Sequence, residues 1–103
     1  MSVINVTKAN FESEVLKSDV PVLADFNAGW CGPCRAMKPM LDELAAGDPA
    51  YKIVSIDIDE EDELADQYDV SSIPCLVVFK GGEEVNRSVG LIARDAIAAL
   101  VEG

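Results

Sequence analysis

The chain has 103 residues, half of them apolar, and carries a net charge of −11 with no histidine. This length allows one small domain, residues 1–103, with a core of its own. The acidity excludes a nucleic-acid or anionic-membrane partner, because phosphate binding requires clustered lysine and arginine. Neither a membrane-spanning apolar stretch nor a secretion signal is visible, so we expect a cytoplasmic monomer that acts on soluble proteins.

The first half of the chain alternates strand and helix patterns. Residues 3–6 have a strand pattern, and Thr7 is a candidate N-cap for a helix over residues 7–17. A buried strand is predicted over residues 21–27, and a long helix follows over residues 31–46.

The second half continues this alternation and then ends in a hairpin. Residues 52–58 form the next predicted strand, followed by an acidic helix and a strand over residues 75–79. Two glycines then suit a tight turn into a strand over residues 84–89, and a helix over residues 93–101 completes the chain. This order predicts an α/β fold with a mostly parallel central sheet, helices on both faces and an antiparallel edge strand.

Two cysteines stand where the second strand meets the long helix, in the segment Trp30-Cys31-Gly32-Pro33-Cys34. Residues three apart share a helix face, so the two sulfurs can close a disulfide. The first amide groups of a helix lack partners and carry partial positive charge, so we expect a lowered pKa for Cys31, the candidate nucleophile. Cys34 is the candidate resolving thiol. Pro33 fits the first helical turn, and Gly32 adds little bulk between the sulfurs.

Two other interpretations of this pair stay open. A C-x-x-C pair can supply half of a zinc site, but a closed site needs four ligands and Cys75 is the one further thiol. We therefore expect no metal in the single chain, and the alternative is an inter-chain zinc or iron–sulfur site that uses Cys31, Cys34 and Cys75. The second alternative is a binding subunit that makes little use of its thiols.

Asp25 is an acidic residue within an apolar strand. Burying a carboxylate without a partner is costly, and the loss of water favours its neutral form. We therefore expect a raised pKa for this group.

In combination and order, five motifs make the chain resemble the thioredoxin family over essentially its whole length. A C-x-x-C pair beside a βαβ pattern is typical of this family, and thioredoxin is itself an established example of a lowered cysteine pKa. The resemblance implies a thioredoxin fold and a protein-disulfide reductase that exchanges its dithiol with the disulfides of target proteins. The motifs are Trp30-Cys31-Gly32-Pro33-Cys34, Asp25-Phe26, Ile73-Pro74, Lys80-Gly81-Gly82 and Val89-Gly90.

The resemblance also implies roles for individual residues. Asp25 matches an aspartate that relays the proton of the inner cysteine, and the Ile73–Pro74 peptide bond is expected to be cis. The backbone of Ile73 is expected to pair with an extended substrate segment, which Trp30, Pro74 and Gly90 border. Gly32 and Pro33 complete the implied substrate-binding set.

The resemblance implies no bound cofactor. Electrons are expected from NADPH through a flavoprotein thioredoxin reductase, with a ferredoxin-linked supply as the alternative. The expected partners are this reductase and disulfide-containing target proteins.

Three residues depart from the family pattern near the expected site. Asn27 replaces the usual tryptophan, Ser55 a frequent lysine, and Cys75 a common threonine. Without the ammonium at position 55, the pKa of Asp25 should be higher than in lysine-bearing relatives. Asn27 leaves Trp30 as the single tryptophan, so its fluorescence should report the disulfide state. Cys75 is a third redox thiol, a site of regulatory oxidation or an inert core residue.

Overall fold

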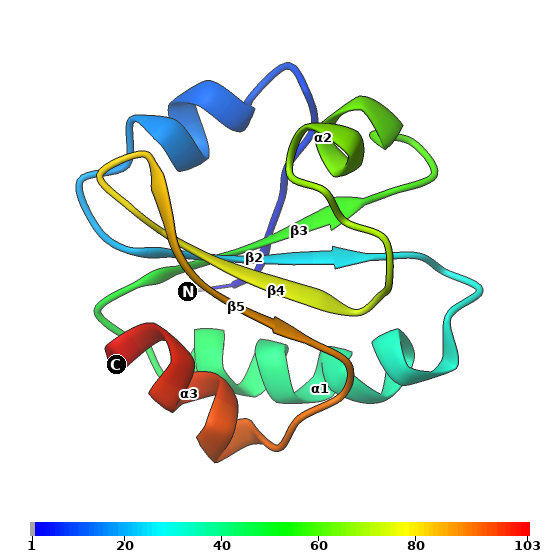
Figure 1. Ribbon diagram of the computed structural model, residues 1–103. Coiled ribbons are helices and arrows are strands. Elements are labelled where there is room, and N and C mark those ends of the chain that lie inside the picture. The colour runs from blue at the N-terminus through cyan, green and yellow to red at the C-terminus, as the bar shows by residue number, and fades with distance from the viewer. Residues whose placement is uncertain (1) are drawn as a thin grey trace.

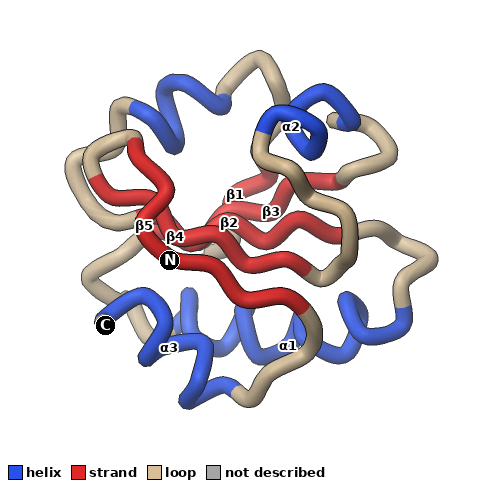
Figure 2. The backbone as a smooth tube through the Cα atoms, in the orientation of Figure 1, coloured by secondary structure: helices blue, strands red, loops and turns tan. Residues whose placement is uncertain are grey.

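The computed structural model describes residues 2–103, which form a five-stranded sheet with helices on both faces (Figures 1 and 2). The strand order is β1-β3-β2-β4-β5. In Figure 1, η1 and α2 cover one face, and α1 and α3 cover the other, as predicted. The elements are β1 (Ile4–Asn5), the π-helix η1 (Glu12–Leu16), β2 (Val22–Asn27), α1 (Gly32–Ala46), β3 (Lys52–Asp57), α2 (Asp62–Gln67), β4 (Cys75–Lys80), β5 (Glu83–Val89) and α3 (Arg94–Glu102).

The sheet is mixed and has an antiparallel edge strand, as predicted, but its parallel and antiparallel strand pairs are equal in number, so parallel pairs do not predominate as expected. The pairs β1–β3 and β2–β3 are parallel, whereas β2–β4 and β4–β5 are antiparallel. Helix α2 has only six residues and stays at the end of the sheet where β3 finishes (Figure 1). Strand β4 therefore starts at that end and runs back beside β2.

The first helix begins later than predicted. Thr7 caps the turn that precedes it: Thr7 Oγ1 accepts a hydrogen bond of 3.2 Å from the Ala9 backbone N–H, and the Thr7 N–H donates to the Asn10 side chain at 2.7 Å. Residues 8–10 form this turn, and the N-cap of η1 is Phe11. The helix that follows is η1, which ends with a bond of 2.9 Å from the Lys17 N–H to the Glu12 carbonyl, five residues back. Within residues 2–103, no helix is long and apolar enough to cross a membrane.

Two apolar clusters fill the space between the sheet and the helices, and β2 contributes to both. Alternate residues of a strand point to opposite faces. Val22, Ala24 and Phe26 therefore lie in the cluster beneath η1 and α2, and Leu23 lies in the cluster with α1 and α3. Asp25 has the same parity as Leu23, so its carboxyl is directed to the α1 face. Among the described residues it is the one charged side chain that is buried.

Candidate redox-active site

Cys31 and Cys34 form a disulfide at the N-terminus of α1, with their Cα atoms 5.2 Å apart. Cys31 is the N-cap of α1, and its Sγ accepts a hydrogen bond of 3.2 Å from the backbone N–H of Cys34. Pro33 in the first turn has no N–H to satisfy, which suits this position. Gly32 and Pro33 are exposed between the two buried cysteines. One sulfur therefore occupies the electropositive end of the helix.

The loop before β4 lies against the disulfide. The Ile73–Pro74 peptide bond is cis, as predicted. The Ile73 carbonyl oxygen lies 4.0 Å from Cys31 Sγ. The Pro74 carbonyl accepts a hydrogen bond of 2.8 Å from the backbone N–H of Gly90, which has φ +99°. This bond joins the start of β4 to the end of β5, so the structure brings Ile73, Pro74 and Gly90 together beside Cys31.

Trp30 lies next to the disulfide with 67% of its surface exposed. Its indole Nε1–H donates to the Asp59 carboxylate at 2.8 Å. Asp59 was not among the site residues predicted from the sequence. The acidic stretch after β3 was visible, but no pattern connects it with a tryptophan 29 residues earlier. The contact holds an otherwise solvent-exposed ring against the loop that follows β3.

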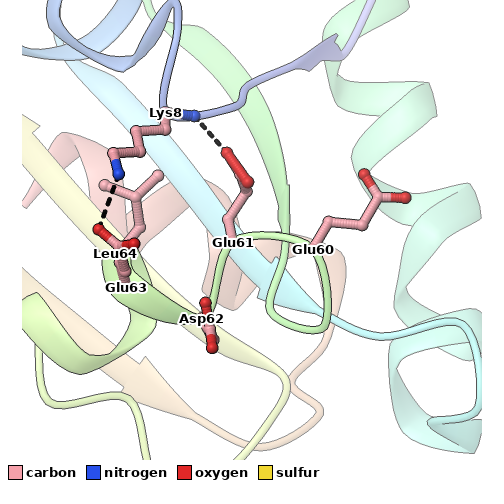
Figure 3. A pocket seen from close by; sticks show the side chains of 6 residues that line it. All are labelled: Lys8, Glu60, Glu61, Asp62, Glu63 and Leu64. Atoms are coloured by element: carbon pink, nitrogen blue, oxygen red, sulfur yellow. Dashed lines mark hydrogen bonds and ion pairs between the residues drawn. The ribbon is translucent and has the colours of Figure 1, made fainter.

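The acidic residues at the start of α2, residues 60–63, line a pocket together with Lys8 (Figure 3). Lys8 Nζ pairs with Glu63 at 2.8 Å, and the Lys8 backbone N–H donates to the Glu61 carboxylate. Glu60 points away from Lys8 in Figure 3. The paired Lys8 and Glu63 side chains are both highly exposed, so this ion pair adds little stability. This cluster connects the loop before η1 to α2.

Asp25 is 5% exposed, and it lines a cleft of about 350 Å³ together with Cys34. Burial raises the pKa of Asp25 from 3.8 to about 7, and a hydrogen bond from Asn27 opposes that rise. The donor, Asn27 Nδ2, lies 3.3 Å from Asp25 Oδ2, whereas Oδ1 has no hydrogen-bond partner among the described residues. The predicted burial and the raised pKa of Asp25 are both confirmed.

Two of the three departures meet each other next to Asp25. Asn27 Nδ2 donates to Ser55 Oγ at 2.8 Å and to the Asp25 carbonyl at 2.8 Å. Ser55 is the register partner of Asp25 in the parallel pair of β2 and β3. Both departures were expected near the site, but their contact with each other was not predictable, because it depends on the register of β2 with β3.

Cys75 lies on the other face of the sheet. Its neighbour Leu76 is the register partner of Asp25 and packs in the α1 cluster, whereas Cys75 is 1% exposed in the cluster beneath η1 and α2. Burial raises the pKa of the Cys75 thiol. Cys75 forms no disulfide, and the structure does not bring it together with Cys31 and Cys34. Among residues 2–103, no three potential metal ligands gather in one place.

The Thioredoxin family model matches residues 2–103. The chain belongs to the thioredoxin family. It is 45% identical over 98 residues to Thioredoxin 1 from Nostoc sp., which covers 94% of this chain and 92% of that protein. It is 41% identical over 104 residues to Thioredoxin C-2 from Corynebacterium nephridii, covering 98% and 94% respectively. A solved thioredoxin mutant from Halobacterium salinarum NRC-1 has a TM-score of 0.90 at 37% identity, over 98% of this chain and 88% of that one.

Family membership and the disulfide at the start of α1 together identify the activity. This thioredoxin-family protein is a protein-disulfide reductase, a thiol–disulfide oxidoreductase whose targets contain disulfides. Thioredoxins need no bound cofactor. The resemblance predicted from the sequence motifs is confirmed, and so is the thioredoxin fold that it implied.

Proposed function

We propose that Cys31 is the nucleophile of this reductase and that Cys34 is the resolving thiol. The observation that carries this assignment is the hydrogen bond of 3.2 Å from the Cys34 N–H to Cys31 Sγ at the N-terminus of α1. In the reduced protein the same amide and the helix dipole favour a Cys31 thiolate.

The reaction then takes two exchange steps. The Cys31 thiolate attacks one sulfur of a target disulfide, and the other target sulfur leaves as a thiolate. The Cys34 thiolate attacks Cys31 Sγ in the mixed disulfide and releases the second target thiolate. Two electrons pass to the target, and the Cys31–Cys34 disulfide is formed.

Asp25 is the proposed general base that accepts the Cys34 proton before the second step. Its position in the cleft lined by Cys34 supports this role. Its pKa of about 7 also supports this role, because a base that titrates near neutral pH can both accept and return a proton.

The proposed docking surface surrounds the disulfide. The Ile73 carbonyl, 4.0 Å from Cys31 Sγ, supports backbone pairing with an extended target segment. Trp30 offers an exposed aromatic face, and Pro74 and Gly90 form the opposite border. Gly32 and Pro33 leave the entrance to the sulfurs free of large side chains.

We further propose that residues 1–103 act as a single monomeric domain in the cytoplasm. Its disulfide would be reduced again by a flavoprotein thioredoxin reductase with electrons from NADPH. Oxidation of NADPH in the presence of such a reductase and insulin tests this supply. Reduction by a ferredoxin-linked enzyme alone would contradict it, and size-exclusion chromatography tests the monomer.

Reduction of insulin disulfides with dithiothreitol as electron donor tests the cysteine roles. We expect Cys31→Ser to abolish turnover and Cys75→Ser, the matched control on the other face of the sheet, to retain it. When it is pre-reduced and mixed with insulin without dithiothreitol, Cys34→Ser keeps the nucleophile but lacks the resolving thiol, so it should accumulate a mixed disulfide with insulin. Accumulation with Cys31→Ser instead would reverse the assignment. A parent protein without turnover would favour the binding or inter-chain metal alternatives.

A further inference from the structure

The side chain of Asn27 connects three groups at the carboxyl end of β2. Its Nδ2 lies 2.8 Å from the Asp25 carbonyl, 2.8 Å from Ser55 Oγ and 3.3 Å from Asp25 Oδ2. The two short bonds use the two N–H groups of the amide, and the contact of 3.3 Å with the carboxylate shares one of them. Asn27 is half-buried, so these bonds are partly shielded from water.

The two cations nearest the cleft are engaged elsewhere. Arg35 and Lys38 line the cleft from α1. Arg35 Nη1, however, donates to the Gly29 carbonyl at 2.9 Å, and Lys38 Nζ binds the Asp42 carboxylate at 3.4 Å. Neither makes a hydrogen bond with the Asp25 carboxylate.

None of the other described residues around Asp25 donates a hydrogen bond to its carboxylate. Cys34 lies across the cleft on α1, and Asp57 on β3 adds a like charge to its wall. On β4, the residue opposite Asp25 is Leu76, which is apolar. Within residues 2–103, Asn27 is therefore the one side chain that donates a hydrogen bond to the buried carboxylate.

We propose that Asn27 is a positioning residue, whose amide, anchored on Ser55, holds the Asp25 carboxylate in the cleft that it shares with Cys34. The catalytic consequence rests on the proposed role of Asp25 as general base.

The expected effect of the amide has a definite sign. A donor to the carboxylate stabilises the charged form, which opposes the effect of burial. Without it, Asp25 stays protonated to higher pH and accepts a proton less readily at neutral pH. A hydrogen bond of 3.3 Å stabilises a charged group less than a shorter one does. We therefore expect the pKa of Asp25 to rise by about 0.5 to 1 unit when the donor is removed.

Titration of the Asp25 side-chain carboxyl by ¹³C NMR in the oxidised protein is the primary test. Asn27→Leu replaces the hydrogen-bond donor with an apolar side chain of similar size. The midpoint of the Asp25 titration should therefore move to higher pH. Asn86→Leu is the matched control: its amide bonds the Leu100 carbonyl on the exposed side of β5, and the Asp25 midpoint should not move. An unchanged or lower midpoint in Asn27→Leu would overturn the inference.

The pH profile of single-turnover insulin reduction by the pre-reduced protein gives the second readout. Its rising limb should shift upward in Asn27→Leu by the amount that the NMR midpoint shifts. The Asp25→Asn variant separates the two proposals. If Asp25→Asn keeps the parent profile, the general-base role fails, while the NMR midpoint still decides the role of Asn27.

Folding is checked by circular dichroism before either measurement. If Asn27→Leu does not fold, Asn27→Val replaces it, because a β-branched residue suits the end of a strand. The same upward shift is expected, and its absence in the folded variant would equally overturn the inference.

Discussion

Replacing Asp25 by asparagine should stabilise the protein, and the gain should grow as the pH rises. Asp25 is 5% exposed, and its pKa rises from 3.8 to about 7 on folding, mainly because it loses water. Between pH 3.8 and about 7, the Asp25 carboxyl therefore keeps its proton in the folded protein and releases it in the unfolded chain. The stability that goes with this proton is fully present below pH 3.8 and is lost as the pH rises through about 7.

The size of the effect follows from the shift. Each pKa unit corresponds to about 1.4 kcal/mol, so a shift of about three units costs the parent about 4 kcal/mol at alkaline pH. Between about pH 4.5 and about pH 8, the stability difference between Asp25→Asn and the parent should grow by about 3 kcal/mol. The cost of burying the new amide is the same at both pH values and cancels from this comparison.

Urea unfolding followed by far-UV circular dichroism at the two pH values measures this difference. Asp42→Asn is the matched control, because it removes an exposed carboxylate from α1 and should change the parent stability by less than about 0.5 kcal/mol at either pH. An Asp25→Asn stability difference that is equal at both pH values would refute the argument. The carboxyl would then titrate alike in the folded and unfolded chains.

Four further predictions follow from the site, the turn and the charge. Reduction of the disulfide should change Trp30 fluorescence, and identical spectra of the two forms would count against this. Gly82→Ala should lower the free energy of unfolding in urea by about 2 kcal/mol more than Gly81→Ala does. Gly82 has φ +82°, and a Cβ added there would lie 2.8 Å from the Leu16 carbonyl oxygen, whereas nothing lies within 4 Å of a Cβ added at Gly81. Equal losses in the two variants would contradict this. The Tm should rise from low salt to about 1 M NaCl or KCl, where screening weakens the repulsion within a chain of net charge −11, and a constant or falling Tm would be inconsistent with it. Cys75 should resist mild peroxide when folded but not in urea, as mass spectrometry can test; modification of the folded protein would show that it is accessible.

Much of the fold was predictable because local patterns are strong along β2 and α1. The apolar residues around Asp25 predicted a buried strand, and that burial in turn predicted the raised pKa. The cysteines and Pro33 indicated the start of α1. The direction of β4 was not predictable, because a strand buried on both faces is uniformly apolar whichever way it runs.

The parts of the site that the sequence did not reveal depend on contacts between distant segments. The Trp30–Asp59 hydrogen bond joins residues on two separate loops, and the bond from Asn27 to Ser55 depends on the register of β2 with β3. Thr7 was expected to cap a helix over residues 7–17, but it caps a turn over residues 8–10, and η1 begins at Glu12 with Phe11 as its N-cap.

The alternation of side chains along β2 also limits where the length of this chain can change. Inserting a single residue before Asp25 would move its carboxylate to the aromatic side of the sheet, where Phe26, Tyr68 and Phe79 pack, and would turn Phe26 towards α1. One inserted residue would therefore disrupt the apolar packing on both faces of the sheet. Deletions and insertions should instead be tolerated in the turn at residues 47–50, which is mostly exposed, and β2 should keep its length in any functional redesign.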